Sequence, residues 1–257
     1  MWQEVSGNWV FIPRRPIAVV HFLGGAFVAA APQATYRRLL EFLANQGGCA
    51  IVATPFINTF DHTAIARAVL RSFERAVAQL HTTSQLQPYL PIYGLGHSMS
   101  CKLHLLMGSL FAVERSGNIL ISFNNFSAGK AIPFIEPLAA STSLEFIPSP
   151  SETTRLIQNH YRTRRNLLVQ FTNDEIDQTP LLKELLHQRF PSMITAQKLP
   201  GSHLTPLGQD LGWKAGSGFT PFDAVGQWMK QELYRELAQL ERTLLLWLDP
   251  LSLGRQK

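Results

Sequence analysis

The sequence predicts an α/β fold, with a mostly parallel central sheet and helices on both faces. Short apolar runs alternate with amphipathic segments from about residue 17 to residue 200, which is typical of buried parallel strands joined by helices. Of the 257 residues, 46% are hydrophobic and only 16% are charged, so the chain has enough apolar side chains for a large core. No internal repeat interrupts the alternation, and we expect one domain over residues 1–257.

The expected elements follow this alternation. Short apolar runs predict strands at residues 8–13, 17–23, 49–54, 89–94, 119–123, 167–171 and 193–199. Amphipathic or polar stretches predict helices at residues 32–45, 61–80, 99–113, 151–165, 179–190 and 223–248. Pro91 counts against the strand at 89–94, because proline donates no hydrogen bond to a sheet.

Ser98 is the candidate nucleophile. It belongs to the only Gly-x-Ser triplet of the chain and lies between a predicted strand and a predicted helix. A sharp turn between two such elements lifts a serine hydroxyl above the edge of the sheet, provided that small residues stand two places before and two places after it. Gly96 and Ser100 occupy those two places.

A serine nucleophile requires a general base, and the base requires a carboxylate that orients it. His203 is the candidate base, because it alone of the eight histidines lies in a loop after a late strand. Gly201 lets that loop bend toward the serine. The other histidines lie in or beside predicted strands and helices or at the turn, and we expect structural roles for them.

Three acidic residues follow the strand at 167–171 and compete for the role of the carboxylate. Asp174 comes first, three residues beyond the strand, where the backbone is held most rigidly, and it is the favoured acid. Glu175 and Asp177 are the alternatives. Asp177 also suits the start of the next helix, for which Thr179 is the expected N-cap and Pro180 the first residue.

An oxyanion formed at Ser98 would need two backbone N–H donors. Met99, the residue after the nucleophile, is expected to supply the first. The second is expected after the early strand at 17–23, where the pair Gly24-Gly25 lets the backbone approach a substrate closely. Leu23 and Gly24 are the candidates for it.

These residues resemble the α/β-hydrolase superfamily over positions 8–204, with the order serine, acid, histidine along the chain. More narrowly, the chain resembles a family of cyanobacteria and chloroplasts known as domain of unknown function 1350. That resemblance rests on His21-Phe22-Leu23-Gly24-Gly25-Ala26-Phe27, Ala31-Pro32-Gln33, Gly96-His97-Ser98, Cys101-Lys102-Leu103-His104-Leu105-Leu106 and Pro200-Gly201-Ser202-His203-Leu204. The resemblance implies a soluble serine-hydrolase scaffold and names no substrate. Ser100 and Phe22 depart from the superfamily, which commonly has glycine at both places.

The leading functional hypothesis is a serine hydrolase of the esterase, lipase or thioesterase kind, acting through a Ser98, His203 and Asp174 triad and an acyl-enzyme. The alternative is a catalytically weak or silent protein of the same fold that binds a lipid-like ligand or a protein partner, which Ser100 and Phe22 would favour.

A long insertion, residues 127–165, leaves the sheet at the edge that carries the nucleophile. It is rich in proline, serine and apolar side chains, and long excursions of this kind are usually functional. We expect a lid, and hence a substrate with a hydrophobic part. The substrate-binding side chains expected at its entrance are Phe134, Ile135, Leu144 and Phe146.

Charge, motif spacing and composition limit the kinds of partner and cofactor that we expect. The net charge of +5 is too small a surplus to indicate nucleic-acid binding, and no spacing of metal ligands or nucleotide-binding glycines is present, so we expect no metal and no cofactor. The apolar run 244–248 is too short to cross a bilayer. Two cysteines and no leader sequence predict a cytoplasmic protein, with the chloroplast stroma for plant relatives.

The C-terminal helix is the remaining candidate for a contact outside the chain. Its apolar stripe predicts core packing, but the stripe broadens near the end of the helix. A homodimer or a peripheral membrane contact is therefore the alternative to a monomer with a small-molecule substrate. The residues concerned are Trp228, Leu233, Leu237, Leu240, Leu244, Leu245, Leu246, Trp247 and Leu248.

Overall fold

The computed structural model describes residues 1–131, 145–208 and 221–249, with residues 221–232 described by their backbone only. Within these residues one sheet has the strand order β1-β2-β4-β3-β5-β6-β7-β8. The first two strands form a hairpin that joins β4 antiparallel, and all other neighbours are parallel. The strands are β1 Gln3–Val5, β2 Asn8–Phe11, β3 Ala18–Leu23, β4 Cys49–Ala53, β5 Ile92–His97, β6 Gly117–Ile121, β7 Asn166–Asn173 and β8 Ile194–Ser202.

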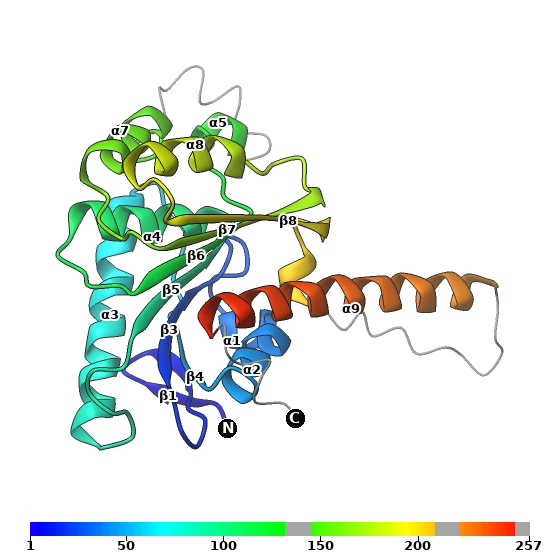
Figure 1. Cartoon of the computed structure of the whole chain (residues 1–257), viewed down its shortest axis with the longest axis horizontal. Coiled ribbons are helices and arrows are strands. Elements are labelled where there is room, and N and C mark those ends of the chain that lie inside the picture. The colour runs from blue at the N-terminus through cyan, green and yellow to red at the C-terminus, as the bar shows by residue number, and fades with distance from the viewer. Residues whose placement is uncertain (132–144, 209–220, 250–257) are drawn as a thin grey trace.

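Helices cover both faces of this sheet (Figure 1). One face packs against α2 and α9, and the opposite face packs against α3, α4, α7 and α8. The expected fold class, a mostly parallel sheet between two helical layers, is therefore confirmed. The helices are α1 Pro32–Thr35, α2 Arg37–Asn45, α3 His62–Thr82, α4 Met99–Leu110, α5 Ala128–Ala131, α7 Pro150–His160, α8 Thr179–Arg189, η1 Thr205–Leu207 and α9 Pro221–Leu248.

The parallel strands direct their carboxyl ends to one edge of the sheet. β3 ends at Leu23, β5 at His97, β7 at Asn173 and β8 at Ser202. The loops that follow carry the glycine pair, Ser98, Asp174 and His203. Residues far apart in sequence thus meet at this edge.

The strand predicted at 89–94 is wrong in its bounds, because β5 covers Ile92–His97. Tyr89 has a φ of 70°, which a strand does not accept. Strand β5 requires glycine at position 94, because a Cβ there would lie 2.7 Å from Nδ1 of His104. Glycine in this strand therefore reflects close packing by α4 and not an early turn.

Other boundaries also differ from the prediction. The helix predicted at 32–45 is divided at Tyr36, which caps α1 and precedes α2. The helix predicted at 151–165 ends at His160, after which the chain is extended. Gln178, and not Thr179, is the N-cap of α8. The hairpin strand β1 was not expected, since three residues are too few for a periodic signal.

The broad apolar stripe of α9 is used in the core. Leu237, Leu240, Leu244 and Trp247 are buried against the sheet and α2, whereas Leu246 is 39% exposed. Trp228 lies outside the described side chains. Among the described helices none is long and apolar enough to cross a membrane. Core packing thus accounts for most of the pattern that suggested a membrane or dimer contact.

Candidate active site

Ser98 stands at a sharp turn between β5 and α4. It has φ 61° and ψ −130°, a left-handed backbone conformation that non-glycine residues rarely adopt. Gly96 is required two places earlier, because a Cβ on it would lie 2.9 Å from the backbone nitrogen of Cys101. Ser100, two places later, is fully buried, and its hydroxyl donates a hydrogen bond to the carbonyl of Gly24. The departure from glycine at this position thus adds a bond between the turn and the glycine pair.

Ser98, His203 and Asp174 form a continuous chain of contacts. Nε2 of His203 lies 3.0 Å from Oγ of Ser98, and Nδ1 of His203 lies 2.8 Å from Oδ2 of Asp174. The Asp174 side chain is fully buried, while that of His203 is 19% exposed. A carboxylate bound to Nδ1 keeps the proton on that nitrogen, so that Nε2 faces the serine as an acceptor.

The contacts distinguish Asp174 from the two alternative acids. Burial opposes the ionisation of Asp174, but hydrogen bonds, the strongest of them from His203, outweigh it, and the net result is a lowered pKa. Asp177 instead accepts the backbone N–H of Thr179 at 2.8 Å, at the start of α8, and burial raises its pKa. Glu175 is exposed. Only Asp174 of the three is hydrogen-bonded to His203.

A buried network that the sequence analysis missed links the glycine pair to the loop of His203. The amide of Gly25 donates to Oη of Tyr36 at 2.8 Å, and Oη of Tyr36 lies 2.8 Å from Nδ1 of His97. Nε2 of His97 lies 2.9 Å from the backbone carbonyl of His203. Burial, followed by the charge of His203, lowers the pKa of His97 to about 3, so the ring is neutral at neutral pH. Tyr36 therefore donates to Nδ1, and the N–H at Nε2 donates to the carbonyl.

Two N–H donors adjoin Ser98. Met99 is the first residue of α4, and an amide at that position has no acceptor within the helix. Asn124 was not predicted, and its Nδ2 lies 2.9 Å from Oγ of Ser98. Leu23 and Gly24, the expected second donors, do not line the cavity at Ser98, whereas the next residue, Gly25, does.

A cavity of about 700 Å³ opens at Ser98 and is bordered mainly by apolar atoms. Phe146 is 7% exposed and lines it, as the lid hypothesis expects of this side chain. Phe134, Ile135 and Leu144 lie outside the described residues. The cavity lining also includes Gly25, Ala26, Phe27, Val28, Asn58, His62, His97, Met99, Lys102, Asn124, Asn125, Phe126, Lys130, Ala131, Glu175, Ile176, His203, Leu204 and Leu207.

The C-terminal part of the expected lid belongs to the body of the protein. Ile157 on α7 and the following Tyr161 are buried in a cluster with α4, α8 and the sheet. The guanidinium of Arg165 stacks on the ring of Trp247, with Cζ 3.9 Å from the ring centroid, and so ties the end of α9 to the sheet. Residues 150–165 are therefore structural, and the described residues of the insertion that border the cavity are Lys130, Ala131 and Phe146.

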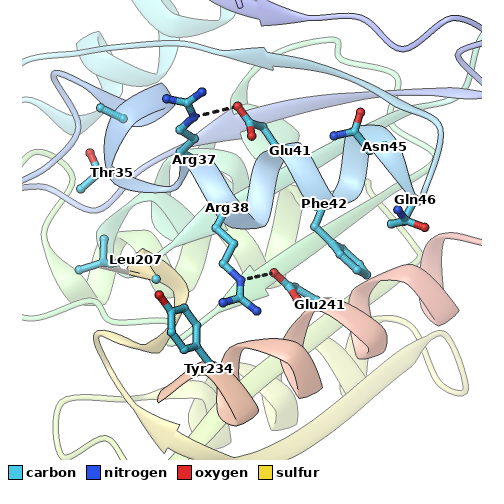
Figure 2. Close-up of a pocket in the computed structure, with 12 residues that line it drawn as sticks. Thr35, Arg37, Arg38, Glu41, Phe42, Asn45, Gln46, Leu207, Tyr234 and Glu241 are labelled. Atoms are coloured by element: carbon cyan, nitrogen blue, oxygen red, sulfur yellow. Dashed lines mark hydrogen bonds and ion pairs between the residues drawn. The ribbon is translucent and has the colours of Figure 1, made fainter. Parts of the chain in front are cut away.

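A second cavity, of about 900 Å³, lies between α2 and α9 (Figure 2). Its charged side chains pair with one another: Arg37 bonds to Glu41 at 2.9 Å, and Arg38 bonds to Glu241 at 3.3 Å across the two helices. None of the candidate catalytic residues lines it. The described residues also contain no group of three or more potential metal ligands.

Comparison with solved structures identifies the fold. A soluble variant of monoglyceride lipase from Saccharomyces cerevisiae, in complex with a substrate analog, is 14% identical, with a TM-score of 0.63 and coverage of 97% of this chain and 94% of the lipase. Carboxyl esterase 2 from the mycorrhizal fungus Tuber melanosporum is 18% identical (TM-score 0.54), with coverage of 88% and 82% of the two chains. S-formylglutathione hydrolase from Staphylococcus aureus is 14% identical (TM-score 0.53), with coverage of 90% and 92%.

A search of curated protein sequences found no match. Residues 1–250, however, match the family described as "Protein of unknown function (DUF1350)". The protein therefore has the α/β-hydrolase fold of esterases, lipases and thioesterases, and it belongs to the DUF1350 family.

Proposed function

We propose that the protein is a serine hydrolase that cleaves a carboxylic ester or thioester with a hydrophobic part. The observation that carries the proposal is the chain of contacts from Ser98 through His203 to Asp174, at the carboxyl edge of a parallel sheet. The strained backbone of Ser98 supports it, because backbone strain of this kind is concentrated at functional sites.

The proposed reaction begins when Oγ of Ser98 attacks the acyl carbonyl and Nε2 of His203 takes the hydroxyl proton. The tetrahedral intermediate then collapses, the bond to the alcohol or thiol breaks, and His203 returns the proton to that leaving group. Water attacks the acyl-enzyme by the same route, with His203 again as the base, and releases the acid and free Ser98. Asp174 stabilises the imidazolium that forms twice in each cycle.

The negative charge of the intermediate needs donors that are already in place. The amide of Met99 and the side-chain amide of Asn124 are the groups that we propose for this role. The Asn124 contact with Oγ supports the assignment, since the oxyanion and Oγ of Ser98 are bonded to the same carbon atom in the intermediate. The Gly25 amide is held by Tyr36 and adjoins the same cavity.

The hydrophobic part of the substrate follows from the cavity lining, in which apolar atoms predominate and Phe146 is nearly buried. An apolar wall binds acyl or alkyl carbons by removing their surface from water, at about 25 cal/mol per Å².

A fluorophosphonate probe tests the proposal. The folded protein should be labelled, and Ser98→Ala should abolish the labelling. Ser109→Ala is the matched control: Ser109 is a buried serine near the end of α4, and its hydroxyl bonds to the carbonyl of Leu105 at 2.8 Å. Folded wild-type protein that resists the probe and hydrolyses no ester would overturn the proposal and favour a ligand-binding protein of the same fold.

A further inference from the structure

The cavity at Ser98 contains a buried histidine that the proposed reaction does not use. His62, the first residue of α3, is 2% exposed, and its ring stacks on Phe146 with a centroid distance of 4.4 Å. Among the described residues, neither of its ring nitrogens has a hydrogen-bond partner. Burial and then the charge of Lys102 lower its pKa to about 3, so the ring is neutral at neutral pH. A neutral imidazole leaves one N–H donor and one acceptor unpaired, which is costly in a buried place.

A buried lysine also lies near Phe146. Lys102 is 1% exposed, and its Nζ lies 5.7 Å from the ring centroid of Phe146. Nζ donates one hydrogen bond, to the carbonyl of Pro148 at 2.9 Å. An ammonium has three protons to donate. No carboxylate lies within ion-pair distance of Nζ in the part of the chain that the structure describes.

Burial lowers the pKa of Lys102 to about 8, although the more distant charges of Glu145 and Glu152 act to raise it. The side chain is thus mostly charged at neutral pH and lacks a neighbouring counter-ion. Lys130 and Glu175, which also line the cavity, are exposed and opposite in sign, so solvent screens them. The buried part of the cavity therefore carries one positive charge beside an unpaired N–H donor.

We propose that Lys102 and His62 bind a carboxylate on the substrate, so that the preferred substrates are half-esters of dicarboxylic acids. This inference rests on the proposed function and narrows its substrate class. A single carboxylate matches the single charge of Lys102 and accepts the free N–H of His62, whereas a doubly charged phosphate would leave one charge unpaired in an apolar cavity. Both side chains line the cavity that contains Ser98.

The placement also guides the choice of substrate length. Lys102 is the fourth residue after Ser98, in the first turn of α4. Four residues correspond to a rise of about 6 Å along a helix. We therefore choose test substrates in which a short chain of methylene groups joins the carboxylate to the scissile ester.

Ethyl hydrogen adipate and ethyl hexanoate provide the test, because they share the ethanol leaving group and the acyl chain length and differ in the terminal carboxylate. We expect kcat/KM of the wild-type protein to favour the half-ester by about tenfold or more, which corresponds to about 1.4 kcal/mol. In Lys102→Met the preference should fall to about one, and in His62→Phe, which keeps the stacking on Phe146, it should be reduced. Lys198→Met, at an exposed lysine, is the matched control and should retain the full preference.

Binding to Ser98→Ala, measured by calorimetry, separates this inference from the proposed function. Adipate half-ester that binds more tightly than ethyl hexanoate supports the carboxylate site whether or not the wild-type protein turns over. Wild-type protein that reacts with the fluorophosphonate but hydrolyses and binds both esters equally overturns the carboxylate site alone. Tighter binding of hexyl phosphate than of either ester would likewise overturn it. If Lys102→Met does not fold, His62→Phe provides the test alone. An undiminished preference for the half-ester in that variant would overturn the carboxylate site.

Discussion

Tyr36→Phe removes a single oxygen atom from the network between the glycine pair and the loop of His203. The ring would remain, buried and packed edge-on against Phe22 at 4.7 Å. The change deletes the acceptor of the Gly25 amide and the donor to Nδ1 of His97. A buried polar group left without a partner costs about 1–3 kcal/mol. Because both Gly25 and His97 border the cavity and water can partly replace the hydroxyl there, we expect a total loss of about 1–3 kcal/mol.

The same change should reduce catalysis through the position of His203. Without the tyrosine proton, His97 can hold its own proton on Nδ1, and Nε2 then has none to donate to the carbonyl of His203. The loop that carries the base would be free to move, and a displacement of about 1 Å at a reacting group can cost about 100-fold in rate. We expect kcat for a p-nitrophenyl ester to fall by about 10- to 100-fold, with KM nearly unchanged.

Tyr161→Phe is the matched control for the stability loss. Tyr161 is also fully buried, and its hydroxyl donates to Asn166 at 2.6 Å and accepts from Asn118 at 2.7 Å, away from the cavity at Ser98. Urea unfolding should show comparable losses for both variants, whereas kcat should fall only in Tyr36→Phe. A wild-type kcat in Tyr36→Phe, or an equal loss of kcat in the two variants, would refute a positioning role.

Further predictions concern the acid, the cavity wall and the pH dependence of stability. Asp174→Asn should remain folded but lose about 10⁴-fold in kcat, because the amide favours the wrong tautomer of His203; Asp177→Asn should mainly lower the free energy of unfolding, and an equal loss of kcat in both would contradict the assignment. Phe146→Ala should raise KM for long acyl esters by an amount equivalent to about 1–3 kcal/mol and leave short esters nearly unaffected, whereas a parallel loss for both chain lengths would place Phe146 in the core alone. The free energy of unfolding should fall on acidification, since buried histidines with lowered pKa values must stay neutral in the folded protein while the unfolded chain takes up protons below about pH 6.5. Each should contribute about 1.4 kcal/mol of loss between about pH 7.5 and 5.5, and urea unfolding that is unchanged over this window would exclude the effect. The histidines concerned, each with its pKa lowered to about 3, are His62, His97 and His104.

Much of the fold was predictable from local pattern. Parallel strands buried on both faces must be continuously apolar, and the helices between them must be amphipathic, so that periodicity alone indicates the layers. The pattern gave the wrong bounds for β5, which contains Gly94 and Gly96, because glycine more often indicates a turn than a strand. Their strand conformation depends on how closely α4 and the neighbouring strand approach, which is a property of packing and not of the local sequence.

Ser98, Asp174 and His203 could be selected from the sequence because each follows a strand, and the carboxyl ends of parallel strands converge at one edge. The sequence favoured Asp174 over Glu175 and Asp177 because it comes first after the strand, but the three lie within four residues of one another and spacing alone does not fix which one contacts His203. The hydrogen bond of 2.8 Å from His203 to Asp174 distinguishes them.

The fold class, the turn at Ser98 and the set of residues that reach the carboxyl edge could be predicted from the sequence, because they depend on short-range periodicity and on residue size. Tertiary packing, by contrast, brings Tyr36 into contact with His97, 61 positions away, and places His62 and Lys102 around Phe146. Such contacts have no signature in spacing. They arise where separate elements pack together, and the free energy of a buried polar group depends on the partner that packing brings to it.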